Sequence, residues 1–248
     1  MIENDPTDDI RRLGEWLTDA GLELVTVRPY GGDELAGDLE GYDALVVLGG
    51  EQHAYPGHDG APAAPWLPAC ESLLRKAVRH RVPTLAVCLG AQLLATAHGG
   101  TVAPAAAGPE IGPTLVARRD AAERDPLFVH VPFLPDVIAW HHDEITELPH
   151  GAVLLAASTH YPHQAFRLGP AAWGVQFHIE PDPDMVARWA VSNGELLARL
   201  GLDAAQVVAA TEAVMDDIAE VWQPFAARFA ALARGELTTR TGLPVIGS

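Results

Sequence analysis

The sequence has few cysteines and few basic residues. Only two cysteines are present, Cys70 and Cys88, with no short metal-ligand spacing between them, so neither a disulfide framework nor a metal site is expected. Lysine and arginine total 16 against 33 aspartate and glutamate residues, which gives a formal net charge of -17. Such a charge repels phosphate backbones and anionic lipid, so nucleic acid and a membrane surface are poor partners.

Long apolar runs are also missing. No stretch approaches the roughly 20 apolar residues that a membrane-spanning helix requires. The first ten residues, MIENDPTDDI, do not have the basic and apolar pattern of a signal peptide. Two unpaired cysteines suit a reducing compartment. We therefore expect a soluble protein in the cytoplasm.

The chain does have enough apolar material for one large core, because 48% of its 248 residues are hydrophobic. Short apolar runs alternate with stretches of helical period, which is typical of βα units that feed a parallel sheet. The predicted fold class is α/β. We expect a flavodoxin-like, doubly wound, mostly parallel sheet with helices on both faces and an antiparallel extension.

The first half of the chain predicts three buried strands and two helices. The strands are expected at residues 22–27, 44–48 and 84–87, and the helices at residues 9–20 and 67–80. The first helix places Leu13, Trp16 and Leu17 on one face and ends at Gly21, a typical helix-ending residue. The segments 54–65 and 102–113, rich in proline and alanine, are expected to be long surface loops.

The second half is richer in strand signals before it returns to helix. Strands are expected at residues 136–140, 152–157, 164–167 and 172–177, several of them antiparallel. Asp182 should cap a helix that has Pro183 in its first turn. A last helix follows Asp203, with apolar residues at helical spacing as far as Leu232 and a kink or division at Pro224.

We divide the chain into a domain at residues 1–200 and a C-terminal helical extension at residues 201–248 that packs on the same domain. A subunit contact, as in a homodimer, is the alternative for the apolar face of the last helix. The tail from Thr238 to Ser248 has no role that the sequence indicates.

Cys88 stands where a predicted buried strand turns into a predicted helix, in the run VPTLAVCLGAQLLA. The small Gly90 and Ala91 would let the helix approach the strand. This is the geometry of a nucleophile elbow, in which the helix N-terminus favours a thiolate and the Leu89 N–H points at an oxyanion formed beside the sulfur. A plain core cysteine is the alternative for Cys88, and it is the role expected for Cys70.

A catalytic thiol needs a base nearby, because only part of it is ionised at neutral pH. His178 and Glu180 lie two positions apart in the run GVQFHIE. If the strand from Val175 continues to Glu180, both side chains project from the same face, about 7 Å apart at Cα. The carboxylate would then orient and stabilise the imidazole. A structural histidine beside a surface acid is the alternative.

Three segments together resemble the class I glutamine amidotransferases. The sequence VCLGAQ at 87–92 is similar to the nucleophile segment of that family, LGG at 48–50 to its glycine turn, and GVQFHIE at 174–180 to its His-x-Glu dyad. The resemblance implies a triad of Cys88, His178 and Glu180. It further implies an oxyanion hole formed by the N–H groups of Gly50 and Leu89.

The resemblance also implies where the substrate lies. Gly49, Gln92 and the loop formed by His141, His142 and Asp143 would contact the glutamyl group. A metal site at this loop is disfavoured, because adjacent histidines on a strand point to opposite faces.

Three positions depart from the usual pattern of the family. Glu51 and Ile179 stand where proline is common, and His142 stands where glycine is common. Only Met1 to Glu3 precede the Asp5-Pro6 turn, whereas the family opens with a longer strand, which leaves open a true start further upstream.

The predicted activity is cysteine-dependent hydrolysis of a γ-glutamyl amide through a glutamyl thioester, with no cofactor. Two small-molecule substrates fit. One is free glutamine, whose ammonia would pass to a separate synthetase because the sequence contains no ATP-binding P-loop. The other is a γ-glutamyl conjugate that is simply hydrolysed. The alternatives are a non-catalytic binding or regulatory subunit and a cysteine-based redox or glyoxalase-type protein.

Overall fold

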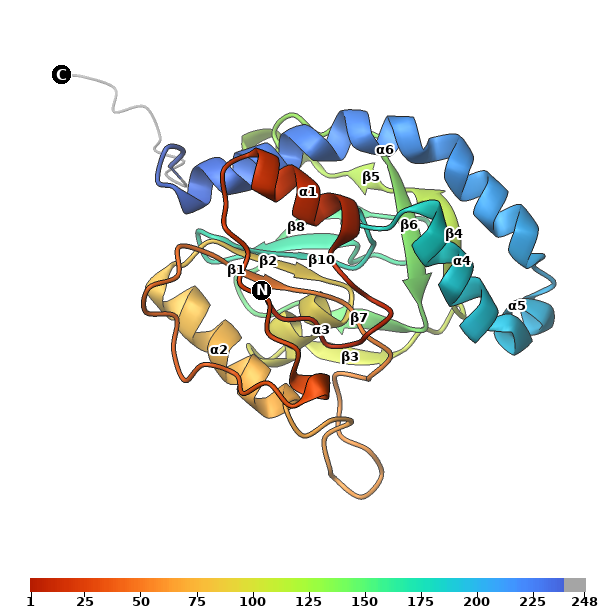
Figure 1. Cartoon of the computed structure of the whole chain (residues 1–248), viewed down its shortest axis with the longest axis horizontal. Coiled ribbons are helices and arrows are strands. Elements are labelled where there is room, and N and C mark those ends of the chain that lie inside the picture. The colour runs from red at the N-terminus through yellow and green to blue at the C-terminus, as the bar shows by residue number, and fades with distance from the viewer. Residues whose placement is uncertain (239–248) are drawn as a thin grey trace.

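A six-stranded sheet forms the centre of the computed structural model, which describes residues 1–238. Its order is β1-β2-β10-β9-β8-β5. The strands β1 (Leu45–Val47), β2 (Thr84–Val87) and β10 (Ala172–Val175) are parallel. The strands β9 (Ala165–Leu168), β8 (Val153–Ala157) and β5 (Ala117–Arg118) continue the sheet antiparallel. The predicted α/β fold, with a parallel centre and an antiparallel extension, is confirmed (Figure 1).

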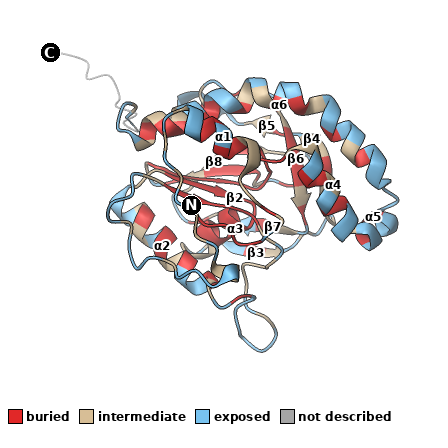
Figure 2. Ribbon diagram, in the orientation of Figure 1, coloured by how far each residue is buried: buried red, intermediate tan, exposed pale blue. Residues whose placement is uncertain are grey.

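Helices cover both faces of the sheet. The helices α1 (Arg11–Asp19), α4 (Pro183–Ser192) and α6 (Ala204–Ala233) pack on one face, and α2 (Leu67–His80) and α3 (Leu89–Thr96) pack on the other (Figure 1). Successive strand residues point to opposite faces. Val46 therefore joins the core under α1, and Leu45 and Val47 join the core under α2 and α3. Figure 2 shows these buried stripes facing the sheet.

The strand predicted at residues 22–27 does not form, so that prediction is wrong. Single bridges form the parallel edge of the sheet instead. Ile2 bridges both Val27 and Val47 in parallel fashion and takes the place next to β1. The segment 22–27 therefore lies at the outer edge, where one face meets solvent, and Val25 is 45% exposed. A short 3-10 helix at Pro29–Gly31 follows.

Two further strand pairs lie beside the main sheet. The strand β3 (Thr101–Pro104) pairs with β7 (Asp143–Glu147), and β4 (Glu110–Leu115) pairs with β6 (Asp136–His141). The prediction of a loop at 102–113 is therefore wrong where β3 and β4 form. Proline is tolerated here because each pair has free edges. The loop at 54–65 is confirmed, and a 3-10 helix at Asp120–Arg124 connects β5 to β6.

The last helix begins as predicted and runs without a break. The Asp203 carboxylate accepts a hydrogen bond from the Gln206 N–H at 2.9 Å, after the short helix α5 (Gly194–Leu200). Pro224 does not divide the helix. It has no N–H to donate to the carbonyl of Glu220, but both residues are exposed, so water can take the place of the missing donor. Figure 1 shows α6 curving over its face of the molecule.

The Trp222 indole N–H on α6 donates to the carbonyl of Asp136 at 2.8 Å, and Trp222 is fully buried. The helix thus shares the core of the preceding residues. The division at residue 200 stays a prediction. Of the tail from Thr238 to Ser248, only Thr238 belongs to the described residues. None of the helices in residues 1–238 is long and apolar enough to cross a membrane.

Candidate active site

Cys88 occupies a strained turn between β2 and α3. Its φ is 50° and its ψ is -108°, a conformation that residues with a side chain rarely adopt. Such strain is found where a fold fixes a functional group in place, as in a nucleophile elbow. The Cys88 N–H donates to the carbonyl of Val175 on β10 at 2.8 Å. The sulfur therefore lies at the C-terminal edge of the parallel strands, where such sheets bind ligands.

The turn is possible because α3 lies unusually close to β1. A Cβ atom added to Gly90 would lie 2.2 Å from the carbonyl oxygen of Val47, which is backbone and cannot move aside. A Cβ on Gly174 would lie 3.2 Å from the Cβ of Ala91 and 2.4 Å from the ring of Phe166. The small residues thus bring the N-terminus of α3 under the cysteine, as predicted.

We expect Gly90→Ala to lower the free energy of unfolding by about 1–3 kcal/mol, because the new methyl group must displace backbone in a packed core. Urea unfolding measures this change. The matched control is Gly194→Ala, since nothing lies within 4 Å of its added Cβ. The control should be neutral or slightly stabilising. A Gly90→Ala variant as stable as the unsubstituted protein would contradict the close approach.

His178 and Glu180 form a buried pair, although not on a continuing strand. The His178 Nδ1 lies 2.5 Å from Glu180 Oε1, and the second carboxylate oxygen accepts the Ile179 N–H at 2.9 Å. The expectation that β10 continues to Glu180 is wrong, because the strand ends at Val175. His178 instead makes an isolated antiparallel bridge with Ile138 on β6, which fixes its backbone in another way.

The charges around His178 favour its protonated form. Burial alone lowers the pKa of the imidazole, but the negative charges of Glu180 and Cys88 outweigh burial and raise the pKa of His178 well above its ordinary value. The Trp189 ring packs edge-on against the imidazole with 4.9 Å between centroids. The imidazole therefore lies between a carboxylate, the thiol and an aromatic wall, and it can hold or release a proton at the sulfur.

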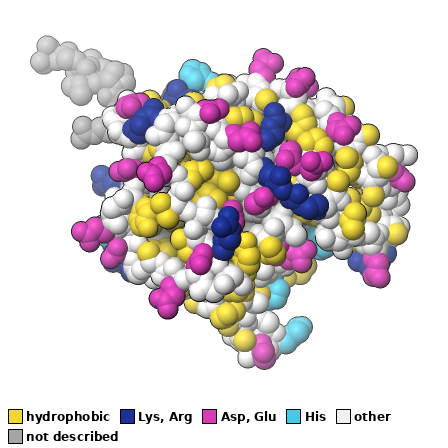
Figure 3. Space-filling view, in the orientation of Figure 1, with side chains coloured by type: hydrophobic (Ala, Val, Ile, Leu, Met, Phe, Trp, Pro, Cys, Tyr) yellow, Lys and Arg dark blue, Asp and Glu magenta, His cyan; other side chains and the backbone are white. Residues whose placement is uncertain are grey.

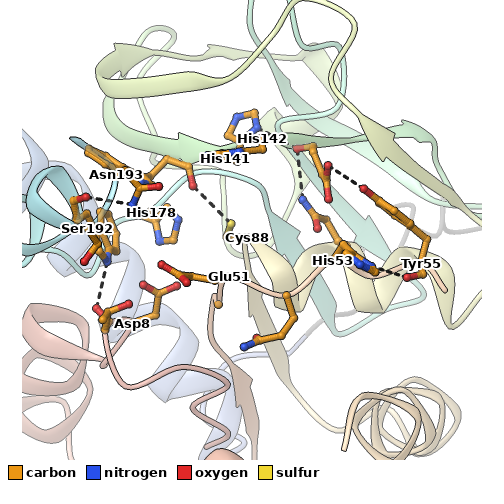
Figure 4. A pocket seen from close by; sticks show the side chains of 17 residues that line it. Asp8, Glu51, His53, Tyr55, Cys88, His141, His142, His178, Ser192 and Asn193 are labelled. Carbon is orange, nitrogen blue, oxygen red and sulfur yellow. Dashed lines mark hydrogen bonds between the residues drawn. The ribbon is translucent and has the colours of Figure 1, made fainter. Parts of the chain in front are cut away.

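A cavity of about 450 Å³ opens over Cys88. Gly50, Gln92, His178 and the whole loop from Trp140 to Asp143 line it, together with Thr7, Asp8, Glu51, Gln52, His53, Tyr55, Trp189, Ser192 and Asn193 (Figure 4). Glu180 lies behind His178 and is 1% exposed. Gly49 and Leu89 are not among the lining residues, but a Cβ on Gly49 would lie 3.1 Å from His178 Cε1, so Gly49 borders the imidazole.

One side of the cavity is a polar network around Gln92. The Gln92 amide donates to the carbonyl of Asp143 at 3.3 Å and to the Gln176 side chain at 3.2 Å. The Gln176 amide in turn lies 3.7 Å from the Cys88 sulfur. The Tyr55 hydroxyl donates to the Asp143 carboxylate at 3.2 Å. The structure thus brings the predicted Gln92 and Asp143 together beside the cysteine.

His141 and His142 differ in their surroundings. His142 is exposed, whereas His141 is buried, with Nδ1 3.0 Å from the Asp143 carbonyl and Nε2 3.0 Å from Glu110 Oε2. Gln164 donates to the same Glu110 oxygen at 2.7 Å. Sequence reasoning missed Glu110, which lies opposite His141 in the β4–β6 ladder. His141 therefore supports the loop, and no group of three or more metal-ligating side chains occurs within residues 1–238.

The sequence model of the family Glutamine amidotransferase class-I matches residues 13–185, more than half of the chain. The chain therefore belongs to the class I glutamine amidotransferase family. The glutamine amidotransferase-like protein YfeJ of Salmonella typhimurium is 31% identical over 166 residues, which cover 67% of this chain and 68% of YfeJ. The crystal structure of a glutamine amidotransferase from Thermotoga maritima superimposes with a TM-score of 0.81 at 25% identity, over 92% of this chain and 96% of that one.

Two other relatives match over less than two thirds of their own length. γ-Glutamyl peptidase 4 of Arabidopsis thaliana is 30% identical over 151 residues, which are 60% of this amidotransferase and 58% of the peptidase. A GMP synthase (glutamine-hydrolyzing) of Thermomicrobium roseum is 37% identical over 121 residues, which are 49% of this chain but only 22% of the synthase.

This amidotransferase has one further acid in its site that sequence reasoning missed. Asp8, from the loop before α1, is 8% exposed, and a Cβ on Gly49 would lie 2.7 Å from its carboxylate. Burial raises the pKa of Asp8 to about 7, with opposing contributions from His178, which lowers it, and from Glu180, which raises it. No spacing in the sequence links residue 8 to residue 178, because tertiary packing alone joins them.

We expect Asp8→Asn to change how stability depends on pH. The pKa of Asp8 is about 7 in the folded state and 3.8 in the unfolded state. Asp8 therefore adds stability that is fully present below pH 3.8 and is lost as the pH rises to about 7. Asparagine does not titrate, so the stability of the variant should lack this fall. The variant should therefore be more stable than the unsubstituted protein above pH 7, by roughly 4 kcal/mol at most. Urea unfolding between about pH 4 and pH 8 tests this, and parallel curves would contradict it.

Proposed function

We propose that this class I glutamine amidotransferase hydrolyses a γ-glutamyl amide through a thioester on Cys88, with His178 as the general base and acid and Glu180 as its orienting partner. The observation that carries the proposal is the position of His178. Its imidazole lies between the Glu180 carboxylate and the Cys88 sulfur, which raise its pKa, at the floor of a cavity wide enough for a small substrate. That arrangement is a nucleophile, a base and an orienting acid.

In the first half of the reaction His178 holds the proton of the Cys88 thiol, and the thiolate attacks the γ-carbonyl carbon of the substrate. The new C–S bond moves an electron pair onto the carbonyl oxygen. The N–H groups of Gly50 and Leu89 would bind this oxyanion. Their residues lie close together, since a Cβ on Gly50 would lie 3.1 Å from Leu89 Cδ2. When the oxyanion collapses, the C–N bond breaks and His178 gives its proton to the leaving nitrogen.

In the second half water replaces the leaving group. His178, now neutral, takes a proton from the water, and the oxygen attacks the thioester carbon. The C–S bond then breaks, glutamate leaves and the thiolate–imidazolium pair is restored. The Glu180 carboxylate stabilises the imidazolium in both halves through its short contact with Nδ1.

The substrate would place its glutamyl end beside Gln92 and the loop of His141, His142 and Asp143. Support comes from the hydrogen bonds that join Gln92 and Tyr55 to Asp143, since these fix polar groups at one side of the sulfur. The similarity to γ-glutamyl peptidase 4 favours a γ-glutamyl conjugate as substrate. The protein would then act alone in a cytoplasmic setting.

Free glutamine is the second candidate substrate, and the similarity to a GMP synthase favours it. In that case the ammonia would pass to a separate synthetase. The two candidates share every step up to the thioester and differ only in the leaving group, ammonia or a larger amine.

Mass spectrometry of the trapped intermediate tests the proposal. The protein is incubated with glutamine, glutathione and γ-glutamyl amines and quenched in acid, and we expect a glutamyl adduct on the peptide that contains Cys88. The compound that gives the adduct and is consumed identifies the substrate. Absence of any adduct, also after treatment with a glutamine-like electrophile, would favour a non-catalytic binding subunit instead.

A further inference from the structure

The cavity over Cys88 has two unlike halves. Figure 4 shows Tyr55 and His53 on one side of the sulfur, and His178, Asp8, Ser192 and Asn193 on the other. The mechanism proposed above requires His178 to protonate the leaving nitrogen, so the leaving group lies in the half beside His178. The side chains of this half therefore decide which leaving groups fit, provided that the proposed function holds.

The half beside His178 contains a buried carboxylate whose only basic neighbour is His178 itself. Asp8 is 8% exposed and its nearest charged neighbours are His178, Glu180 and Asp5. The neighbouring Asp9 is the opposite case, because the arginines Arg11 and Arg188 reach it at 2.7 and 3.5 Å on the outer surface. A buried carboxylate is normally paired, since its desolvation is otherwise uncompensated. With its pKa raised to about 7, mainly by burial, Asp8 is partly protonated near neutral pH, and a cation bound beside it would favour the charged form.

Other features of this half also favour positive charge. Glu51 adds a second carboxylate on the same side of Cys88 as Asp8 (Figure 4). The rings of Trp140 and Trp189, 5.4 Å apart, form an aromatic wall of the kind that binds ammonium groups.

Lysine and arginine are absent from the lining. Among the described residues that line the cavity the only basic side chains are histidines, so a leaving group with a carboxylate would have no lysine or arginine to pair with. The acidic surface adds to this effect, because the net charge is -17 and Figure 3 shows Asp and Glu side chains spread over the face in view.

We propose that the half of the cavity beside His178 binds a positively charged leaving group, so that the substrate is the γ-glutamyl amide of a diamine or polyamine. Asp8 and Glu51 pair with the distal ammonium of the amine, and Trp140 and Trp189 pack along its methylene chain. The nitrogen of the scissile amide then lies at His178.

Three γ-glutamyl conjugates of similar length test the proposal: those of putrescine, butylamine and γ-aminobutyrate, which end in an ammonium, a methyl group and a carboxylate. We expect kcat/KM for the putrescine conjugate to exceed that for the butylamine conjugate by about tenfold and that for the γ-aminobutyrate conjugate by about a hundredfold. Asp8→Asn and Glu51→Gln should each reduce the preference. Asp9→Asn, a matched change outside the cavity, should retain it.

Binding to a Cys88→Ala variant, measured by calorimetry, gives the same comparison without turnover. The dissociation constants should follow the same order of charge. Equal rates for the three conjugates would leave the thioester mechanism in place and overturn the charge preference. If the three conjugates bind in the expected order but none of them is hydrolysed, the result would support this inference and contradict the proposed function. Tighter binding of the γ-aminobutyrate conjugate would overturn the inference outright.

Discussion

Replacing Cys88 with alanine is expected to lower kcat/KM for a γ-glutamyl amide by about 10⁴-fold or more, because every later step passes through the bond to its sulfur. The stability of the variant should change little, because alanine keeps the strained backbone and removes only two long contacts of the sulfur, 3.7 Å from the Gln176 amide and 4.0 Å from the Trp140 carbonyl. Steady-state kinetics and urea unfolding measure the two effects separately.

Cys70→Ala is the matched control for this change. Cys70 is fully buried in α2, and burial raises the pKa of its thiol to about 12, so it supplies no thiolate. The control variant should keep full activity and the adduct on Cys88, although the small cavity lowers its stability. Loss of activity in Cys70→Ala together with retained activity in Cys88→Ala would reverse the assignment of the nucleophile.

Glu180→Gln is expected to lower kcat by about 10²–10⁴-fold, because the amide no longer stabilises the imidazolium and can select the wrong tautomer of His178. Without the carboxylate charge, burial should dominate and the pKa of His178 should fall. The alkaline limb of the pH–rate profile, where His178 loses the proton that the leaving nitrogen needs, should therefore move to lower pH. Glu147→Gln is the matched control, since Glu147 is exposed on β7 and bonds only Thr101.

The same substitution makes a prediction about stability. A histidine with a raised folded-state pKa adds stability that is fully present below its ordinary pKa, about 6.5, and is lost as pH rises through the folded value. The unsubstituted protein should therefore lose free energy of unfolding in the alkaline range. Glu180→Gln should show a smaller loss there. An unchanged pH–rate profile and unchanged stability would remove Glu180 from the triad.

The local parts of the site could be predicted from the sequence. The run from Val82 to Gln92 contains its own strand, turn and helix signals, and the structure has β2, Cys88 and α3 at the predicted positions. The helix α2 has the predicted bounds, and Asp182 caps α4 by accepting the Met185 N–H at 2.7 Å. These features depend on contacts within a few residues, which composition and spacing encode directly.

Features that depend on distant partners could not be predicted in this way. The segment 22–27 has the alternation of a strand but forms a single bridge, to Ile2, and 102–113 looks like a loop until β6 and β7 pair with it. Asp8 and Glu110 join the site from separate loops and strands. Their roles become visible only once the distances to His178 and His141 are known.

The way α6 shares the core makes the site depend on the last helix. Trp222, Phe225 and Phe229 fill the same core as Val46 and Ile138, and Ile138 carries the bridge that holds His178. A chain that ends before residue 222 would lack these aromatic rings beside the bridge. A truncation more than a hundred positions after Cys88 should therefore loosen the imidazole of the site as well as the core (222 - 88 = 134).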